Sequence, residues 1–467
     1  MNAYHRAESR RPGQAGVNSS RRDFLKKAGT ATAGSLAALL LPGAPRAGTL
    51  RPDASQTLPD STPGDELFWL GIRSQFVLDQ NSIYMNTGTE GSMPRTVLAG
   101  LYAYSHKFAQ KPMDSVSYDE DLNMKQEKNC RCLAAFVGAD PEEIVLTTNT
   151  TEGMHIAVNG LDLNEGDEIL TTLHEHDAAL SPLHVLQDRR GVTVTELALP
   201  SPAPGAGEII SAFSSAITRR TRALCFCHIN YTTGLRMPVR ELCALARTKG
   251  LITIVDGAHA MGMLNVDLHD LGCDFYACAT HKWLNGPPGT GLLYIRSARE
   301  NPCCLWPVLT EVYSAAYLLS ITQMLQMRGQ QNTPALCAMK DAMEFQNKIG
   351  KDRIEGRILA LNRYLKEKIA EVWGPESLLT PLEDDALSSG LASFVPCPNF
   401  SDRYEREKVS SVYKALREQY GITIRYINFR DRQTDTADTY ALRVSTHIFN
   451  SYGEIDELIA AVKAITG

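Results

Sequence analysis

The chain has 467 residues, which is enough for a large hydrophobic core and for more than one structural lobe. Hydrophobic residues make up 43% of the sequence and charged residues 21%, as is usual in soluble globular proteins. The formal net charge of −6 argues against a nucleic-acid partner, because proteins that bind nucleic acids usually present a basic surface.

The N-terminal segment 1–47 resembles a twin-arginine signal peptide. Arg21 and Arg22 stand in the segment SRRDFLK, a weakly apolar stretch follows at 28–41, and small residues at 44–47 offer a cleavage site. The apolar stretch is shorter than the about 20 residues that cross a bilayer, so we expect no stable membrane anchor. The resemblance implies that the twin-arginine export machinery carries the folded protein to the periplasm; a basic cytosolic tail is the alternative.

Residues 48–65 are rich in Pro, Ser, Thr and Asp, and we expect a flexible linker there. From 66 to 335, short apolar runs alternate with helical patterns, which predicts a large α/β domain whose seven-stranded sheet is mostly parallel. Residues 336–467 are expected to form connecting helices and a smaller C-terminal α+β domain. The predicted strands of the large domain are 143–148, 168–172, 192–197, 223–229, 251–256, 274–280 and 291–295, and helices are predicted at 151–161 and 238–249.

The last third of the chain begins with a long helical pattern at 334–373. Ligands of α/β sheets bind beyond the carboxyl ends of the strands, so the polar residues that follow each strand are the candidates for a functional site. In the smaller domain, strands are predicted at 391–395, 422–427 and 441–446, and helices at 407–419 and 454–466.

The 11 cysteines of the chain do not follow the spacing of a zinc site, and we predict no structural metal. Disulfides stay an open alternative for an exported protein. Four cysteines lie in or beside strand-like runs and are interpreted as small buried hydrophobic residues: Cys225, Cys227, Cys273 and Cys278.

The strongest chemical pattern lies between residues 251 and 295. The apolar run 251–255 ends at Asp256, and the strand-like run 274–279 ends shortly before Lys282. A carboxylate and a lysine would therefore open on one crevice. Pyridoxal phosphate (PLP) chemistry needs this pair: the lysine forms an imine with the cofactor aldehyde, and the carboxylate keeps the pyridine nitrogen protonated. Either residue alone would be better explained as a helix cap or an exposed loop residue.

The segments VDGAH (255–259), DFY (274–276) and THKWL (280–284) resemble those of class V aminotransferases, and within them isopenicillin N epimerase-like proteins. The similarity extends from about residue 84 to residue 452. It implies the PLP-dependent transferase fold type I and a homodimer. It also implies that Lys282 is the Schiff-base lysine.

The resemblance further implies which neighbouring residues contact the cofactor. His259, Thr280 and His281 flank Asp256 and Lys282 and are expected beside the cofactor. Lys282 is expected to remove the α-proton of the substrate. A lysine in this role must be largely unprotonated, which partial burial beside cationic groups favours.

Two further segments follow predicted strands. The segment LTTNTTEG (146–153) closes a strand and opens a helix, where backbone N–H groups and the helix dipole hold phosphate, and the resemblance points to Thr150 and Thr151. In LHEHDA (173–178), His176 matches the ring that the family stacks on the cofactor and is counted with the catalytic residues. A zinc site with His174 is the alternative to stacking.

The substrate side is expected to involve two other segments. Asn230, in the turn NYTTG (230–234), is the candidate for a contact with the cofactor ring oxygen, and Asn86 lies in a glycine-rich loop that resembles the family's substrate-side loop. Arg443 matches the arginine that the family presents to the substrate carboxylate through two parallel hydrogen bonds. A turn residue and an edge-strand arginine are the simpler readings of Asn230 and Arg443.

Two departures limit what the resemblance implies. Where the family often has Gly-Thr as a phosphate contact from the partner subunit, this chain has Gly329 and Gln330. Cysteine desulfurases carry a catalytic cysteine near the region 426–430 here, and no cysteine follows Cys397. A persulfide-forming desulfurase is therefore disfavoured.

The sequence thus predicts a PLP enzyme that acts on a small-molecule or peptidic amino substrate. Transamination, epimerisation and C–S lysis all stay open, because PLP stabilises the carbanion and orientation decides which bond breaks. Export favours aminotransferase-type tailoring of a periplasmic metabolite such as a pyoverdine-like siderophore. A non-catalytic binding protein on the same scaffold is the alternative class, whereas a nucleotide-dependent oxidoreductase lacks its glycine motif.

Overall fold

The computed structural model describes residues 65–110, 112, 120–298, 301–315, 318–396, 400–430 and 437–467. The predicted signal peptide (1–47) lies outside these residues, as does the predicted linker apart from residue 65. The described residues belong to one compact unit. In the described part of the chain, no helix is both long enough and apolar enough to cross a membrane.

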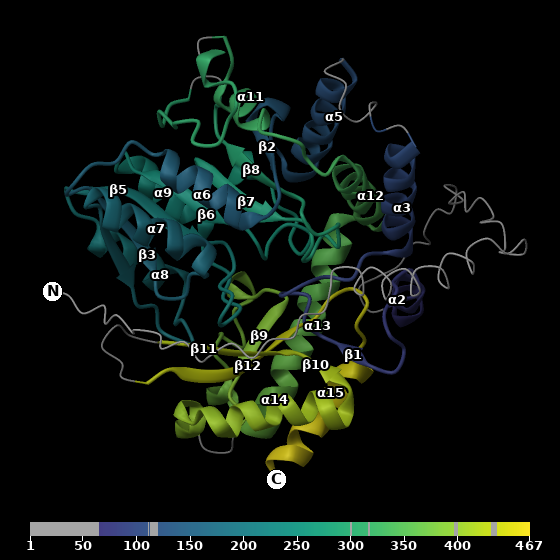
Figure 1. The fold of residues 1–467 in the computed structure, drawn as a ribbon. Coiled ribbons are helices and arrows are strands. Elements are labelled where there is room, and N and C mark those ends of the chain that lie inside the picture. Colours follow the sequence, from purple (N-terminus) through teal and green to yellow (C-terminus); the bar gives the residue numbers. More distant parts are fainter. Residues whose placement is uncertain are drawn as a thin grey trace, which may run out of the picture. The chain divides into compact units, whose positions relative to one another are not determined.

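A seven-stranded sheet forms the centre of the larger part of the molecule (Figure 1). Its strand order is β2-β8-β7-β6-β5-β3-β4; β8 pairs antiparallel with both β2 and β7, and the other pairs are parallel. The predicted mostly parallel sheet is confirmed. The strands are β2 (Ile144–Thr147), β3 (Glu168–Thr172), β4 (Thr193–Leu197), β5 (Thr221–Cys227), β6 (Ile252–Asp256), β7 (Phe275–Ala279) and β8 (Gly291–Ile295).

The sheet is buried on both faces, which explains why its strands read as continuous apolar runs. In β8, Leu292 and Tyr294 join one hydrophobic cluster, whereas Leu293 and Ile295 join the other. Helices α6 (Thr150–Gly160), α7 (Asp177–Arg190) and α11 (Ile321–Gln326) contribute to the second cluster. The first cluster includes residues of α5 (Glu120–Val137), α8 (Ala206–Ala216), α9 (Val239–Thr248), α10 (Leu268–Leu271) and α12 (Thr333–Ile349).

Long helices connect the larger part to the smaller one. The predicted helical stretch 334–373 is two helices, α12 and α13 (Lys351–Trp373), because Gly350 has a positive φ of 98° that an α-helix cannot accommodate. Helices α2 (Glu66–Arg73) and α3 (Arg95–Gln110) precede the sheet in the chain. The short 3₁₀ helices are η1 (Pro141–Glu143), η2 (Tyr313–Ala315), η3 (Pro375–Ser377), η4 (Asp385–Leu387) and η5 (Phe400–Tyr404).

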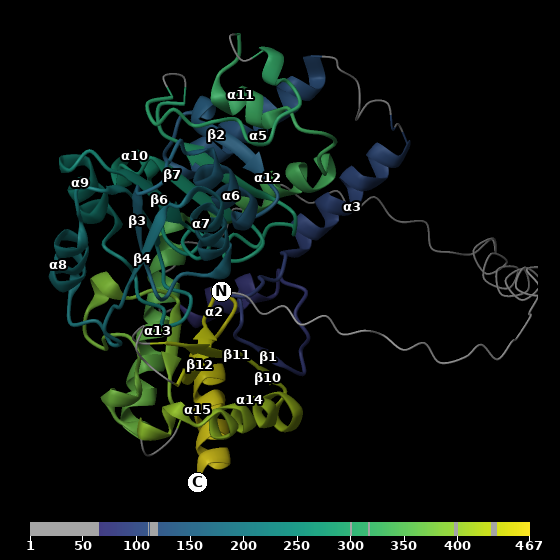
Figure 2. The same cartoon turned by 60° about the vertical axis from the view of Figure 1, so that its left-hand side comes forward.

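The smaller part contains a three-stranded antiparallel sheet of order β11-β12-β9, which lies below the large sheet in Figures 1 and 2. The predicted single strand 422–427 is wrong: β10 pairs with β1 from the start of the described chain, whereas β11 pairs with β12. The N-terminal segment therefore packs with the C-terminal part. The elements are β1 (Ile83–Tyr84), β9 (Leu391–Phe394), β10 (Ile422–Thr423), β11 (Arg425–Phe429), β12 (Thr439–Ser445), α14 (Arg406–Tyr420) and α15 (Tyr452–Thr466).

The four cysteines expected in the core are buried there. Cys225 joins the second hydrophobic cluster, and Cys227, Cys273 and Cys278 join the first. All four are free thiols. Their burial confirms that they act as small hydrophobic residues.

Candidate active site

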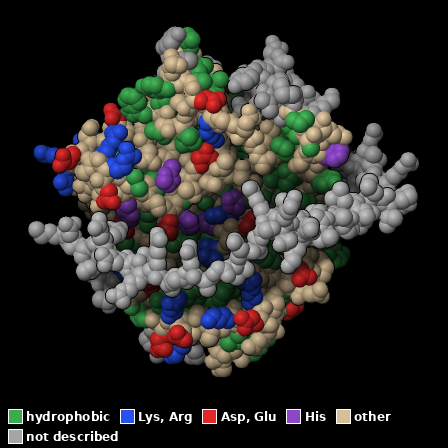
Figure 3. All heavy atoms as spheres, viewed as in Figure 1, with side chains coloured by type: hydrophobic (Ala, Val, Ile, Leu, Met, Phe, Trp, Pro, Cys, Tyr) green, Lys and Arg blue, Asp and Glu red, His purple; other side chains and the backbone are tan. Residues whose placement is uncertain are grey.

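A cavity of about 340 Å³ lies where the carboxyl ends of the central strands meet the smaller sheet. In the space-filling view, histidine, basic and acidic side chains gather in the hollow between these two parts (Figure 3). Eight of the predicted site residues line this cavity: Thr150, Thr151, His176, Asp256, His259, His281, Lys282 and Arg443.

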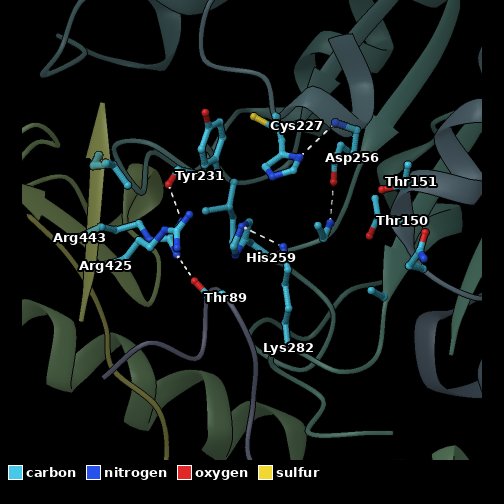
Figure 4. Close-up of a pocket in the computed structure, with 18 of the residues that line it drawn as sticks. Thr89, Thr150, Thr151, Cys227, Tyr231, Asp256, His259, Lys282, Arg425 and Arg443 are labelled. Atoms are coloured by element: carbon cyan, nitrogen blue, oxygen red, sulfur yellow. Dashed lines mark hydrogen bonds between the residues drawn. The ribbon is translucent and has the colours of Figure 1, made fainter. Parts of the chain in front are cut away.

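Lys282 follows β7 and reaches into the cavity with its amine beside His259 (Figure 4). Burial, together with the charge of Arg443, lowers the pKa of Lys282 to about 8, against the raising effect of Asp256. Its Nζ lies 3.4 Å from Nε2 of His259, and Nδ1 of the same ring accepts a hydrogen bond of 3.2 Å from the Trp283 indole.

The hydrogen bond from the Trp283 indole fixes the tautomer of His259, and this tautomer affects Lys282. An indole N–H only donates, so Nδ1 of His259 carries no proton and Nε2 does. Burial lowers the pKa of His259 well below its usual range, so the ring is neutral. Its Nε2–H can then donate only to a lone pair on Lys282, which a neutral amine has and an ammonium lacks. The contact with His259 thus favours the nucleophilic form of Lys282.

Asp256 ends β6 and is 4% exposed. Its Oδ1 accepts a hydrogen bond of 2.9 Å from the Ala258 N–H. Burial raises the pKa of Asp256, while the Ala258 N–H and the charge of Lys282 oppose that rise. The turn after Asp256 requires a glycine, because a Cβ on Gly257 would lie 1.9 Å from the Tyr276 ring. This turn directs the carboxylate toward the cavity.

Helix α6 presents its N-terminus to the same cavity. Asn149 caps the helix by accepting a hydrogen bond of 2.9 Å from the Glu152 N–H. The Thr150 hydroxyl is buried and has no partner among the described residues. Thr151 follows in the first turn, where backbone N–H groups have no intrahelical acceptor and attract anions. An ion pair of 2.9 Å between Glu152 and Arg328 holds this turn in place.

His176 caps α7 and faces the cavity. Its Nδ1 accepts a hydrogen bond of 3.1 Å from the Ala178 N–H, and its ring lies 5.0 Å from that of Tyr231. Burial and the charge of Lys282 lower the pKa of His176, so its imidazole is neutral near neutral pH.

The zinc alternative at His174 and His176 finds no support in the geometry. The His174 ring is bonded at 2.8 Å to Thr232 Oγ1 and does not line the cavity. Within the described ranges, three potential metal ligands come together only at Asp140, Glu143 and His269, none of which lines the cavity.

Arg443 lies on β12 and is 3% exposed. Its Nη1 donates to the Tyr231 carbonyl at 2.9 Å and its Nη2 to the Thr89 hydroxyl at 3.2 Å. Its Nε is buried without a partner in the described part of the chain. Burial and the charge of Arg425 lower its pKa to about 10, so the guanidinium stays charged near neutral pH. Gly88 permits this packing, since its Cβ would lie 3.2 Å from Nη2.

Three predicted site residues do not line the cavity: Asn86, Asn230 and Thr280. The Asn230 carboxamide oxygen accepts hydrogen bonds of 3.1 and 3.3 Å from two N–H groups of its own turn. Asn86 accepts a bond of 2.8 Å from the Thr89 hydroxyl, and the Thr280 hydroxyl bonds to that of Thr290. In the structure, these side chains shape the loops that carry the cavity residues.

Other cavity residues were not singled out from the sequence. Thr89 lies three positions from the predicted Asn86, and Tyr231 lies one position from the predicted Asn230. The sequence therefore indicated the correct segments but not the residues that line the cavity. Cys227 lies opposite Asp256 in the sheet register, which parallel pairing of two predicted strands could have indicated. Arg425 gave no sequence signal of its own, because its place depends on pairing with a distant strand.

Comparisons with known proteins found a matching family model and similar relatives. The family model described as Aminotransferase class-V matches residues 83–458. Isopenicillin N epimerase of Streptomyces clavuligerus is 29% identical over 410 residues, which are 85% of this chain and 98% of that protein. A cysteine desulfurase of Salmonella dublin is 24% identical over 84% of this chain and 97% of its own length.

The fold is also found among solved structures. A lysine-to-alanine mutant of C-DES, with glycine covalently linked to its PLP cofactor, has a TM-score of 0.70 and 24% identity. The match covers 84% of this chain and 98% of that one. The predicted fold, type I of the PLP-dependent transferases with a large α/β domain, is confirmed.

Proposed function

Because this chain belongs to the class V aminotransferase family, we propose that it is a PLP-dependent enzyme acting at Cα of an amino-acid substrate, with aminotransferase-type chemistry. One observation carries this proposal: Lys282, Asp256 and Arg443 line a single cavity. The cavity thus offers a lysine of lowered pKa, a buried carboxylate and a guanidinium to one small molecule.

The residues of the cavity fit PLP. The α6 N-terminus with Thr150 and Thr151 would hold the phosphate, and the buried, unpartnered Thr150 hydroxyl is a donor that the rest of the described chain leaves for a ligand. His176 would lie against the pyridine ring, and Asp256 would accept from its nitrogen. When bound, PLP supplies an electron sink for negative charge that develops on Cα.

Each charged residue then has a defined task. The Arg443 guanidinium binds the substrate carboxylate through parallel hydrogen bonds, which fixes the direction of the Cα–H bond. Lys282, whose pKa is lowered to about 8, accepts the α-proton at its Nζ when the amine is neutral and can return it. Opposite a protonated pyridine nitrogen, Asp256 is expected to ionise despite its burial, because a nearby positive charge lowers a carboxyl pKa.

Epimerisation is the second candidate, supported by the 29% identity to an isopenicillin N epimerase across nearly all of that protein. Both reactions start with removal of the α-proton and differ in where the proton returns. A persulfide-forming desulfurase has less support, because β11 at the cavity contains no cysteine. A non-catalytic binding protein would not need a cavity lysine of lowered pKa beside His259.

The cellular setting is part of the proposal. The twin-arginine segment, which lies outside the described residues, supports a periplasmic enzyme, and the family resemblance supports a homodimer. A peptidic siderophore of the pyoverdine type is the proposed substrate.

The first test is an absorption spectrum of purified protein and of Lys282→Ala, followed by borohydride reduction and peptide mapping. We expect a yellow protein with the cofactor fixed on the peptide that contains Lys282, and no fixation in the variant. Incubation with amino acids in D₂O then separates the reactions: a keto acid indicates amino transfer, and a deuterated D-isomer indicates epimerisation. A colourless protein that takes up no PLP would contradict the proposal and favour a binding protein.

A further inference from the structure

A second arginine, Arg425, shares the cavity with Arg443. The two residues are register partners on the antiparallel strands β11 and β12, and both line the cavity. Figure 4 shows their side chains together, on the opposite side of the cavity from Thr150 and Thr151. The amine of Lys282 lies between these two sides (Figure 4). Both guanidinium groups are therefore on the side of the cavity away from the proposed phosphate site.

No carboxylate in the described part of the chain forms an ion pair with either arginine. Other, partly buried arginines outside the cavity do have one, such as Arg296 with Asp274 and Arg328 with Glu152. Like charges directly opposite each other on neighbouring strands destabilise a sheet. That repulsion contributes to the lowered pKa of Arg443. The fold therefore keeps two unneutralised cations together at the cavity, an arrangement that an anionic ligand would stabilise.

The two arginines differ in depth. Arg443 is buried and already has two hydrogen bonds to the protein, which fix its direction. Arg425 is exposed and lines the mouth of the same cavity together with Asn428 of its strand. A carboxylate at Arg443 would balance one positive charge and leave the charge of Arg425. A second anion, farther from Cα, would balance that charge.

We propose that Arg425 binds a second carboxylate of the substrate, so that the enzyme selects amino substrates with two acidic groups. This inference rests on the proposed function, since it takes the first carboxylate to be held by Arg443. The second carboxylate can belong to a free dicarboxylic amino acid or to a residue of a peptide. Both sources present the same chemistry to the guanidinium, a planar anion able to accept two parallel hydrogen bonds.

The test compares acids with their side-chain amides, which have nearly the same shape and lack the second charge. L-aspartate, L-glutamate and L-2-aminoadipate are each compared with the corresponding amide on the PLP-loaded enzyme, by cofactor absorbance and initial rates. We expect at least one acid to bind about tenfold or more tightly than its amide, mainly through KM. A γ-glutamyl dipeptide and an α-glutamyl dipeptide serve as the peptide-borne arm.

The variant Arg425→Gln should bring the acid-to-amide ratio close to one, and Arg425→Lys should keep part of the preference. Arg417→Gln is the matched control, because Arg417 is exposed on α14 and lines no part of the cavity. It should keep the wild-type ratio. Circular dichroism checks that each variant is folded. A wild-type ratio near one, or an equal loss for acid and amide in Arg425→Gln, would overturn the inference.

Calorimetry keeps this test independent of catalysis. Glutarate and its monoamide are titrated into wild-type and Arg425→Gln protein, and tighter binding of glutarate to wild type alone supports the inference. Equal binding of the two compounds overturns it. A protein that turns over amides as readily as acids would overturn this inference and leave the proposed function standing. Failure to fix PLP on Lys282 would instead remove the proposed function.

Discussion

Lys282 and Lys366 both have a lowered pKa, but they differ in their hydrogen bonds and in their position relative to the cavity. Burial lowers the pKa of each lysine to about 8. Lys366, on α13, donates hydrogen bonds of 2.8 Å to the Pro381 carbonyl and to the Ser388 hydroxyl. Among the described residues, the Lys282 amine has one hydrogen-bond contact, of 3.4 Å with His259, and it lines the cavity.

A lowered pKa therefore does not by itself mark a catalytic lysine. Lys366 has acceptors that hold its amine in a fixed place, and it lines no part of the cavity that contains Asp256. Lys282 lies in that cavity beside a histidine that can donate to it. Geometry and unfilled hydrogen-bonding capacity separate the two lysines, whereas desolvation does not.

The largest expected effect is the difference in α-proton exchange between variants of the two lysines. Lys282→Ala should lower the rate of α-proton exchange by about 10²- to 10⁴-fold, because the general base and the cofactor attachment are both lost. Lys366→Met should leave the rate per folded enzyme within about twofold, because Lys366 lines no part of the cavity. Exchange of the α-proton in D₂O, followed by NMR, measures both.

Rescue by a small amine distinguishes the loss of a catalytic amine from a loss of structure. Added methylamine should restore part of the activity of Lys282→Ala and none of any deficit in Lys366→Met. Equal losses in the two variants, with normal circular dichroism, would mean that the cavity lysine has no special role.

The next effect is a pH dependence of cofactor uptake. Only the neutral amine of Lys282 can attack the PLP aldehyde, so the rate of attachment to apoprotein should rise roughly tenfold per pH unit below pH 8 and level off above it. Stopped-flow absorbance measures this rate, with free lysine as the reference for the titration of PLP itself. A midpoint near 10.5 would show that Lys282 is not perturbed.

Lys366 should reveal the same pKa through stability instead of reactivity. Its pKa is 10.5 in the unfolded chain and about 8 in the folded protein, so the unfolded state binds more protons between these values. The unfolding free energy of wild type relative to Lys366→Met should therefore increase from pH 8 to 10.5, by up to about 1.4 kcal/mol per pH unit. Below pH 8 the difference should be constant. Urea unfolding across this range measures it.

The sequence is informative where local rules decide the structure. Strands buried on both faces give continuous apolar runs, and a polar residue beyond a strand end is exposed to a crevice, which is why Asp256 and Lys282 could be identified. The rule fails where pairing is non-local. The run 422–427 is one apolar pattern, yet its first residues pair with β1 and its last with β12.

The site residues likewise divide into those that local sequence rules identify and those that non-local pairing places. Arg425 is brought to the cavity by its register with Arg443, which no local pattern encodes. Asn230 and Thr280 stand at the expected strand ends, but their side chains bond to their own loops. Short polar side chains often satisfy nearby backbone groups in this way, so a position at a strand end does not guarantee a contact with a ligand.

The smallest expected effect concerns two buried hydroxyl groups, which can be compared in the same way as the two lysines. Thr150 and Thr171 both have a buried hydroxyl without a partner in the described ranges. Thr150 lies at the N-terminus of α6 and lines the cavity, whereas Thr171 lies within β3 and does not. If the cavity holds phosphate at α6, Thr150→Val should raise the dissociation constant of PLP about tenfold, the effect of one hydrogen bond to a charged group.

Thr171→Val is the isosteric control and should leave the dissociation constant unchanged. Its unfolding free energy should stay equal or increase, because valine removes an unsatisfied polar atom from the sheet. Equilibrium titration of apoprotein with PLP and thermal unfolding measure the two quantities. If Thr150→Val behaves like Thr171→Val, the phosphate is held elsewhere, and an unpartnered buried donor is no better a sign of a ligand than a lowered pKa.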